Sequence, residues 1–185
     1  MAVIQENELL LQLKQEGTRR QAFDRLIREY QQMLYFHIRR MVIDHDDADD
    51  VLQNTLLKAW RNIEKFRGDS ALKTWLYRIA TNEALTFLNK KKKVSKTGVE
   101  NIENDMRHSM SGGKYISGDE IQLKLQAAIA TLPDRQRLVF NMRYYDEMKY
   151  DEISKSLDVS VGALKASFHH AVKKIEKKLT EGLDK

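Results

Sequence analysis

Helical periodicity in several long stretches, without strand-like alternation anywhere, most constrains how this chain can fold. In residues 20–41 apolar side chains recur every three or four positions, and similar spacing returns in 47–60 and 72–88. Such spacing places the apolar side chains on one face of a helix, where they can pack together. No segment alternates over enough residues to predict a sheet. We therefore expect an all-α fold.

A break in this periodicity divides the chain. Between residues 94 and 118 the apolar spacing is lost, and the run SMSGGKYISG is rich in serine and glycine. This composition is typical of a flexible linker. Beyond it, helical spacing resumes at about 119–130 and continues towards the carboxyl terminus. We expect two small helical domains joined by a flexible linker, with bounds of 1–93, 94–118 and 119–185.

Several residues predict where helices begin. Gly68 supplies a turn within FRGDS, and Asp69 or Ser70 can cap the helix that follows. Carboxylates after Asp44 suit the positive amino-terminal end of another helix. The single proline, Pro133, suits the first turn of a further helix because its φ angle is already helical.

The last part of the chain has the pattern of a helix-turn-helix. A short helix is expected at 149–157, a tight turn at 158–160, and then a long helix that Ser160 can cap. Residues 159–178 hold five lysines against the single Glu176, although the net charge of the whole chain is only +5. A helix with small and basic outward residues can enter the major groove of DNA. The outward residues are Ser160, Gly162, Ala163, Lys165, Ala166, Ser167, His169, His170, Lys173 and Lys174.

Nothing in the chain predicts catalysis. There is no cysteine, none of the five histidines stands at metal-ligand spacing, and no glycine-rich phosphate loop occurs. The acidic cluster at 44–50 lacks the glycine and terminal glutamate of a calcium loop. We expect a non-enzyme with no catalytic residue, no metal site and no cofactor. Without a long apolar run or a signal peptide, we also expect a cytoplasmic protein that does not insert into a membrane.

Four runs in order resemble a known family. They are DADDVLQNTLLKAW (47–60), FRGDSALKTWLYRIATNEAL (66–85), LPDRQRLVFNMRY (132–144) and YDEISKSLDVSVGALKASFHHAV (150–172). Together they look like an extracytoplasmic-function (ECF) sigma factor of bacterial RNA polymerase. The resemblance covers about residues 20–93 and 119–180. It implies a transcription initiation factor whose first domain binds core polymerase and the promoter −10 element, and whose second domain reads the −35 element.

The resemblance also implies a polymerase contact. The run 47–60 matches the helix that docks on the clamp coiled coil of the largest polymerase subunit. Its outward side is polar, which suits a partner helix. The residues expected to bind core polymerase are Asp49, Asp50, Gln53, Asn54 and Lys58.

The loop 66–71 matches the one that captures a flipped base of the −10 strand in this family. An unstacked base exposes edges that an amide or a backbone group can pair with, and lysines can meet the phosphates. We expect Trp75 to be a core residue because it shares an apolar stripe with Leu72 and Ile79. The residues expected at the −10 DNA are Phe66, Arg67, Gly68, Asp69, Ser70, Lys73, Asn82, Lys90 and Lys91.

This chain departs from the family in its recognition helix. Many relatives have threonine or arginine where this chain has Ala163, Ser167 and His170, and the turn DEMK (146–149) lacks the usual glycine. Because arginine reads guanine with two hydrogen bonds, the −35 preference of better-known members does not carry over. The partners implied are core RNA polymerase, double-stranded −35 DNA, single-stranded −10 DNA and an anti-sigma factor. Two alternatives stay open, a stand-alone helix-turn-helix transcriptional regulator and an interaction protein without a DNA role.

Overall fold

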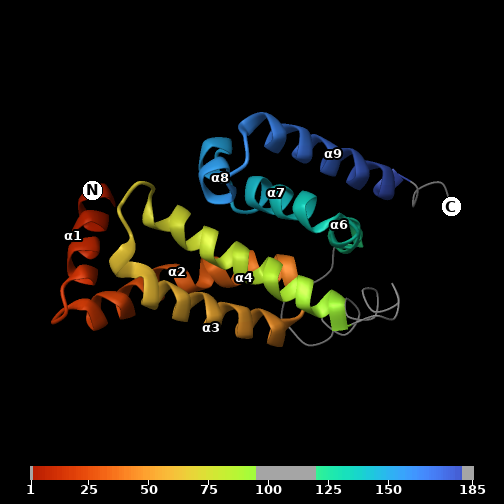
Figure 1. The fold of residues 1–185 in the computed structure, drawn as a ribbon. Helices are drawn as coiled ribbons and strands as arrows, with labels where there is room; N and C mark the ends of the chain where they lie inside the picture. The colour runs from red at the N-terminus through yellow and green to blue at the C-terminus, as the bar shows by residue number, and fades with distance from the viewer. Residues whose placement is uncertain (1, 95–119, 181–185) are drawn as a thin grey trace.

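The computed structural model describes residues 2–94 and 120–180, and within these ranges all regular structure is helical (Figure 1). The first domain contains α1 (Ala2–Lys14), α2 (Arg19–Val42), α3 (His45–Asn62), the 3₁₀ turn η1 (Ile63–Lys65) and α4 (Leu72–Val94). The second contains α6 (Glu120–Ala130), α7 (Asp134–Tyr144), α8 (Tyr150–Leu157) and α9 (Val161–Thr180). The all-α expectation is confirmed. The expected linker, 94–118, lies outside the described residues except for Val94, the last residue of α4.

In the first domain, α2, α3 and α4 lie side by side, and α1 packs across α2 at one end (Figure 1). Their apolar stripes meet in one core, in which Leu26, Leu34, Ile38 and Leu76 are fully buried. Burying a side chain of this size stabilises a fold by about 2 kcal/mol. The core therefore holds α4 in a fixed orientation against α3.

Local features set the helix ends. The carboxylate of Asp44 accepts a hydrogen bond from the backbone N–H of Asp47 at 3.0 Å, so Asp44 caps α3 as its position predicted. Gly68 has a φ angle of +83°, a left-handed conformation that side-chain-bearing residues rarely adopt. This turn redirects the chain into α4. Pro133 directly precedes the first residue of α7, one position before the expected helical turn.

The second domain packs α6, α7 and α8 against α9. The rings of Phe140 and Phe168 stack at 5.7 Å between centroids, and Ala171 and Ile175 are buried beside them. These contacts join α7 to α9. The face of α9 that carries Phe168, Ala171 and Ile175 is thus packed against the domain. The opposite face of α9 is open to solvent.

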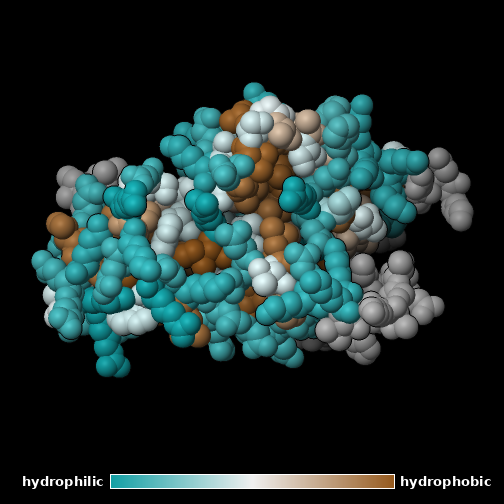
Figure 2. All heavy atoms as spheres, in the orientation of Figure 1, coloured by the Kyte–Doolittle hydropathy of each residue, from teal (hydrophilic) through white to brown (hydrophobic). Residues whose placement is uncertain are grey.

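The two domains also pack on each other. The short helix α8 lies against α4, and α7 lies against α2 (Figure 1). The first-domain core continues without a break into Leu138, Met142 and Ile153 of the second. Hydrophilic residues cover most of the visible face in Figure 2, and hydrophobic ones gather over α7, with smaller patches lower down towards α4. Separate domains were predicted from the sequence, but this contact between them was not.

None of the described helices combines the length and the apolar character required to cross a bilayer.

Candidate functional site

The carboxyl-terminal domain contains the predicted helix-turn-helix. Helix α8 ends at Leu157, its C-cap Asp158 has left-handed φ and ψ angles of 56° and 46°, and α9 begins at Val161. The hydroxyl of Ser160 accepts a hydrogen bond from the backbone N–H of Ala163 at 3.3 Å, which confirms the predicted cap. Ile153 and Leu164 are buried between the two helices and fix their angle. The geometry is that of a recognition helix presented by a supporting helix.

The outward face of α9 is open. Every outward residue named from the sequence is exposed except Ser167, which is half-buried. A Cβ atom added at Gly162 would meet no atom within 4 Å, so packing does not require glycine there. Small residues at the start of α9 instead leave room for another molecule to approach the backbone.

Lys165, Lys173 and Lys174 of α9 keep their charge available. The Lys165 ammonium lies 5.9 Å from the centre of the Tyr150 ring, and the Lys174 ammonium donates to the Gln136 amide oxygen at 3.0 Å. Both partners are uncharged, and Lys173 is exposed. A phosphate chain beside α9 would therefore meet uncompensated positive charge.

A second polar face lies on α3. Asp50, Gln53 and Asn54 are exposed on the side of α3 turned away from its buried residues Val51 and Thr55. These are residues that the family resemblance assigns to the polymerase.

Of the residues beside this polar face of α3, one adds an apolar contact and two already have partners within the domain. Leu57 is 53% exposed, one turn beyond Gln53, and supplies an apolar contact that the sequence did not single out. Asp49 lies 3.6 Å from the His45 ring nitrogen. Lys58 pairs with Glu83 on α4 and is therefore committed to a contact within the domain. The strongest candidates for a partner are the three residues Asp50, Gln53 and Asn54.

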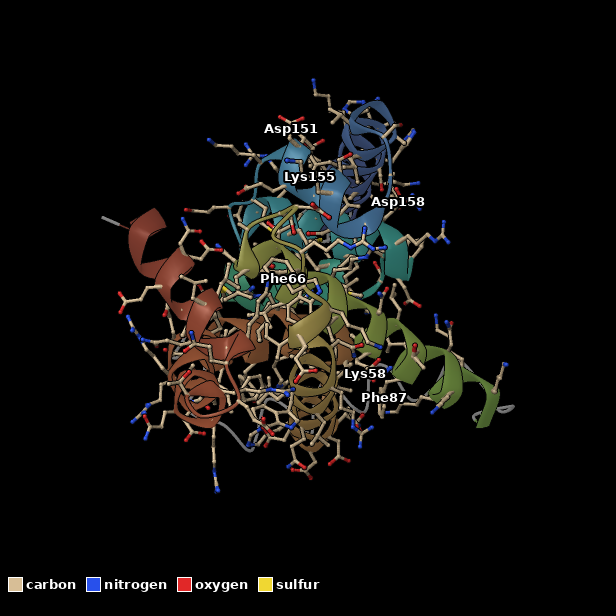
Figure 3. All side chains as sticks on the ribbon, turned by 60° about the vertical axis from the view of Figure 1, so that its left-hand side comes forward. Lys58, Phe66, Phe87, Asp151, Lys155 and Asp158 are labelled. Carbon is tan, nitrogen blue, oxygen red and sulfur yellow. The ribbon has the colours of Figure 1, made fainter. Side chains whose placement is uncertain are left out.

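The loop before α4 is anchored from within. Phe66, labelled in Figure 3, is only 6% exposed. Its ring lies 5.2 Å from that of Trp75. Arg67, Gly68 and Asp69 are exposed, as is Lys73 at the start of α4, whereas Ser70 is half-buried. Phe66 therefore supports the loop and does not project from it in this state.

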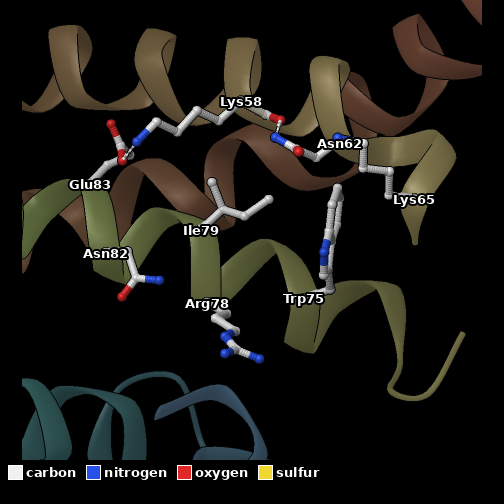
Figure 4. A pocket seen from close by; sticks show the side chains of 8 residues that line it. All are labelled: Lys58, Asn62, Lys65, Trp75, Arg78, Ile79, Asn82 and Glu83. Carbon is white, nitrogen blue, oxygen red and sulfur yellow. Dashed lines mark hydrogen bonds and ion pairs between the residues drawn. The ribbon is translucent and has the colours of Figure 1, made fainter. Parts of the chain in front are cut away.

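A crevice of about 340 Å³ opens between α3 and α4, beside this loop (Figure 4). Its chemistry is mixed, since it contains three cations, one carboxylate, two amides and the edge of an indole. The residues that line it are Lys58, Asn62, Lys65, Trp75, Arg78, Ile79, Asn82 and Glu83. The dashed lines in Figure 4 show that Lys58 reaches Glu83 and that the Asn62 amide donates to the backbone oxygen of Lys58. Lys65 and Arg78 are exposed cations at the crevice.

The structure corrects the sequence prediction for Trp75. It was expected in the core, but it is half-buried, with Phe66 on one side and the crevice on the other. Arg78 and Lys65 were missed as site residues. The signal was present, because residues 75, 78 and 82 share one face of a helix. From the sequence, Trp75 was instead assigned to the core, because its spacing matches the apolar stripe of Leu72 and Ile79.

The basic end of α4 is partly paired. The Lys91 ammonium lies 2.8 Å from a carboxylate oxygen of Asp47, and that of Lys92 lies 2.5 Å from one of Asp134. Lys90 is exposed. Of the two lysines expected at DNA, Lys90 is thus the more accessible in this state.

Comparison with known proteins agrees with these features. Residues 26–94 match the family model for sigma-70 region 2, and residues 122–175 match the model for sigma-70 region 4. The chain is 32% identical to the RNA polymerase sigma-H factor of Pseudomonas aeruginosa, over 97% of this chain and 96% of that protein. The chain belongs to the sigma factors of RNA polymerase. It is also 31% identical to the ECF RNA polymerase sigma-E factor of Escherichia coli strain K12, over 94% of each chain.

Solved structures share the fold of this sigma factor. One is the sigma factor RpoE in complex with the anti-sigma factor NepR from Bartonella quintana, with a TM-score of 0.64, 22% identity, and coverage of 85% of this chain and 96% of that one. Another is CnrH in complex with the cytosolic domain of CnrY, with a TM-score of 0.69, 20% identity, and coverage of 95% and 97%. Both likenesses extend through the two helical domains.

Glu6 contributes to the site although it lies outside residues 26–94, which match sigma-70 region 2. A carboxylate oxygen of Glu6, on α1, accepts a hydrogen bond from the backbone N–H of Leu72 at 2.5 Å. It thereby caps α4, the role that the sequence assigned to Asp69 or Ser70. The two partners are 66 residues apart, so no local pattern could predict the contact. Through this bond α1 fixes the loop end from which α4 starts.

Replacing Glu6 by alanine should lower the free energy of unfolding by about 1 kcal/mol, because the first N–H of α4 loses its acceptor. Urea denaturation measures the change. Glu8→Ala is the matched control, since Glu8 is an exposed carboxylate on the same helix. Equal stability of the two variants would show that the bond to Leu72 contributes nothing.

Proposed function

We propose that this sigma factor divides promoter recognition among three surfaces. The exposed face of α3 binds core polymerase, the crevice between α3 and α4 holds the unpaired −10 strand, and α9 reads the −35 duplex. The observation that carries the proposal is the crevice with its exposed cations and amides, placed beside the loop at 66–71. The protein acts in the cytoplasm as a regulatory subunit, and the polymerase performs the chemistry.

The chemistry of the crevice supports a single-stranded ligand. Trp75 offers part of its ring to a base, Asn82 can pair with a base edge, and Arg78 can neutralise a phosphate. A DNA duplex hides its base edges inside the stack, so these groups suit a strand that is already unpaired. That is the state of the −10 element during initiation.

The outward face of α9 supports duplex reading. Its small residues permit close approach to the major groove, and Lys165, Lys173 and Lys174 suit the flanking phosphates. His169 and His170 are exposed and can contribute to base contacts that arginines make in other members of the family.

An anti-sigma factor is the proposed inhibitor. The similar RpoE structure contains an anti-sigma factor, and the surfaces that it would need on this chain are the exposed faces described above. We propose that an anti-sigma partner binds this sigma factor too.

In vitro transcription with core polymerase and a pool of genomic promoters tests the function. A sigma factor should direct initiation from a subset of promoters and bind duplex DNA weakly alone. A stand-alone helix-turn-helix regulator would bind duplex DNA tightly without polymerase and start no transcript. An interaction protein without a DNA role would show no salt-dependent DNA binding in any assay.

Alanine at Lys165, Lys173 or Lys174 should reduce the salt dependence of promoter binding by the holoenzyme. Each lost phosphate contact lowers the slope of log K against log salt by roughly 0.9. Binding measured at several salt concentrations gives the slope. Lys14→Ala, an exposed lysine on α1, should leave the slope unchanged.

Gly162→Ala should raise the stability of the fold but lower the affinity for −35 DNA. The added Cβ meets no atom of the protein and improves helix propensity, so unfolding should cost about 0.5 kcal/mol more. If α9 approaches DNA closely at this point, −35 binding should fall several-fold despite the gain. An unchanged affinity for −35 duplex, measured with the holoenzyme, would place Gly162 away from the DNA.

A further inference from the structure

Asp146 joins the two domains through a buried ion cluster. One carboxylate oxygen of Asp146 accepts a hydrogen bond from Nδ1 of His37 at 2.8 Å, and the other lies 2.6 Å from a guanidinium nitrogen of Arg40. The side chain of Asp146 is 4% exposed and that of His37 is fully buried. His37 and Arg40 are on α2, whereas Asp146 follows α7 in the turn DEMK. His37, Arg40 and Asp146 lie outside all four runs on which the family resemblance rests.

Further groups complete the contact. The amide of Asn141 donates to the backbone oxygen of Arg40 at 3.3 Å, and Arg40 stacks over the Tyr145 ring at 4.7 Å. Nε2 of His37 lies 3.0 Å from the Thr81 hydroxyl. We call His37, Arg40, Asn141 and Asp146 the interdomain latch. Its members come from both domains, and each makes a hydrogen bond to a member on the other domain.

The Asp146 carboxylate stays charged near neutral pH. Burial alone would raise the pKa of Asp146, but the hydrogen bond and charge of His37, together with Arg40, hold that pKa below its usual range. Burial raises the pKa of Tyr77, which faces the cluster from α4, and the charge of Asp146 raises it further. A lowered carboxyl pKa stabilises the closed contact above the unfolded value of 3.8, and this contribution is lost only as the pH falls through the folded value. Protonation of Asp146 is therefore not the physiological way to open the latch.

The closed contact conflicts with promoter binding. Helix α8 packs on α4, where the Ser156 hydroxyl donates to the backbone oxygen of Thr74 at 3.3 Å. Helix α8, which supports the recognition helix α9, is thus held against α4, which forms one wall of the crevice. The −35 and −10 elements are about 25 base pairs apart, which is roughly 85 Å of duplex at 3.4 Å per pair. One closed molecule cannot contact both elements at once.

The length of the chain permits opening. Residues 95–119 connect the domains, and 25 residues span up to about 85 Å when fully extended. The domains can therefore separate by the required distance without unfolding either helical bundle.

We propose that the interdomain latch is an autoinhibitory contact that keeps the two promoter-binding domains together until core polymerase separates them. The proposal rests on the sigma function proposed above. A closed majority state reduces apparent affinity for polymerase by the fraction of open molecules. Removing one partner of a buried ion pair strongly destabilises the contact, because the remaining charge stays buried.

Asp146→Asn in the full-length chain tests the latch, and Glu147→Gln is its matched control. Glu147 is the next residue, it is exposed, and the substitution removes the same charge. Because the chain has no cysteine, Arg28→Cys on α2 and Glu176→Cys on α9 can carry spin labels in each background. Electron-spin distance measurements then report the domain separation, and a titration with core polymerase reports affinity.

We expect Asp146→Asn to lengthen and broaden the interdomain distances and to raise apparent polymerase affinity roughly tenfold. Glu147→Gln should change neither. Unchanged distances in Asp146→Asn, or opened domains with no gain in affinity, would overturn the proposal. If Asp146→Asn fails to fold by circular dichroism, Arg40→Gln opens the same latch from its half-exposed side and must give both effects. Polymerase binding by the wild-type chain in the same titration tests the sigma assignment separately.

Discussion

Lysine at both Asp50 and Gln53 should abolish binding to core polymerase, with the apparent Kd rising at least about 100-fold. Both side chains are exposed on α3, so the double variant should fold and melt like the wild type. The physical reason is charge reversal at the centre of the polar face, where like charges across an interface cost several kcal/mol. Fluorescence anisotropy with labelled sigma factor measures the affinity.

Gln21→Lys with Asp24→Lys is the control for this experiment. Both residues are exposed on α2, have the same three-residue spacing, and add the same charge. The control should bind polymerase within about twofold of the wild type, because surface charges away from an interface act weakly at physiological salt. Transcription retained by the Asp50 and Gln53 variant would remove α3 from the polymerase interface.

The helices could be predicted because their signals are local. The helix expected at 20–41 is α2, Arg19–Val42, and the one expected at 149–157 is α8, Tyr150–Leu157. Apolar spacing and capping residues act within a few positions of each other, so one sequence suffices to read them. The helix-turn-helix could be predicted for the same reason, since its helices and turn are contiguous in the chain.

The contacts between distant segments could not be predicted. Asp146 lies 109 residues from His37. A periodic stripe shows that a helix buries one face, but it does not show against which partner. His37 is one of the five histidines that lack metal-ligand spacing, and its pairing with a turn of the other domain has no sequence signature. The closed arrangement of the domains is therefore a finding of the structure alone.

The residues of the crevice could be predicted only in part. Asn82 and the loop before α4 were expected at the −10 strand, and the structure brings Asn82 together with Lys58, which had been assigned to the polymerase. The pairing of Lys58 with Glu83 explains the difference, since it turns the lysine towards α4. Which side of a helix a long cation covers depends on its neighbour across the interface, and the neighbour is unknown from sequence.

Glutamate at both Lys65 and Arg78 should reduce open-complex formation at least about 30-fold while polymerase binding stays within twofold. Both cations are exposed at the crevice, and Glu83 already places one carboxylate there. Two added carboxylates would repel the phosphates that the wild-type cations attract. Fluorescence of a base analogue in the −10 element reports opening. Lys14→Glu with Arg28→Glu makes the same charge change on exposed sites of α1 and α2 and should leave opening intact.

A second template separates strand capture from duplex melting. If the crevice holds the unpaired strand, the Lys65 and Arg78 variant should bind weakly even to a promoter whose −10 region is already mismatched, because the phosphates are still repelled. If the cations act only while the duplex opens, the mismatched template should restore wild-type binding, since its strands need no melting. Capture is the role that the geometry favours, because Trp75, Asn82 and Arg78 line one crevice and each suits a different part of an unpaired nucleotide. Full rescue on the mismatched promoter would move the strand-holding site away from this crevice.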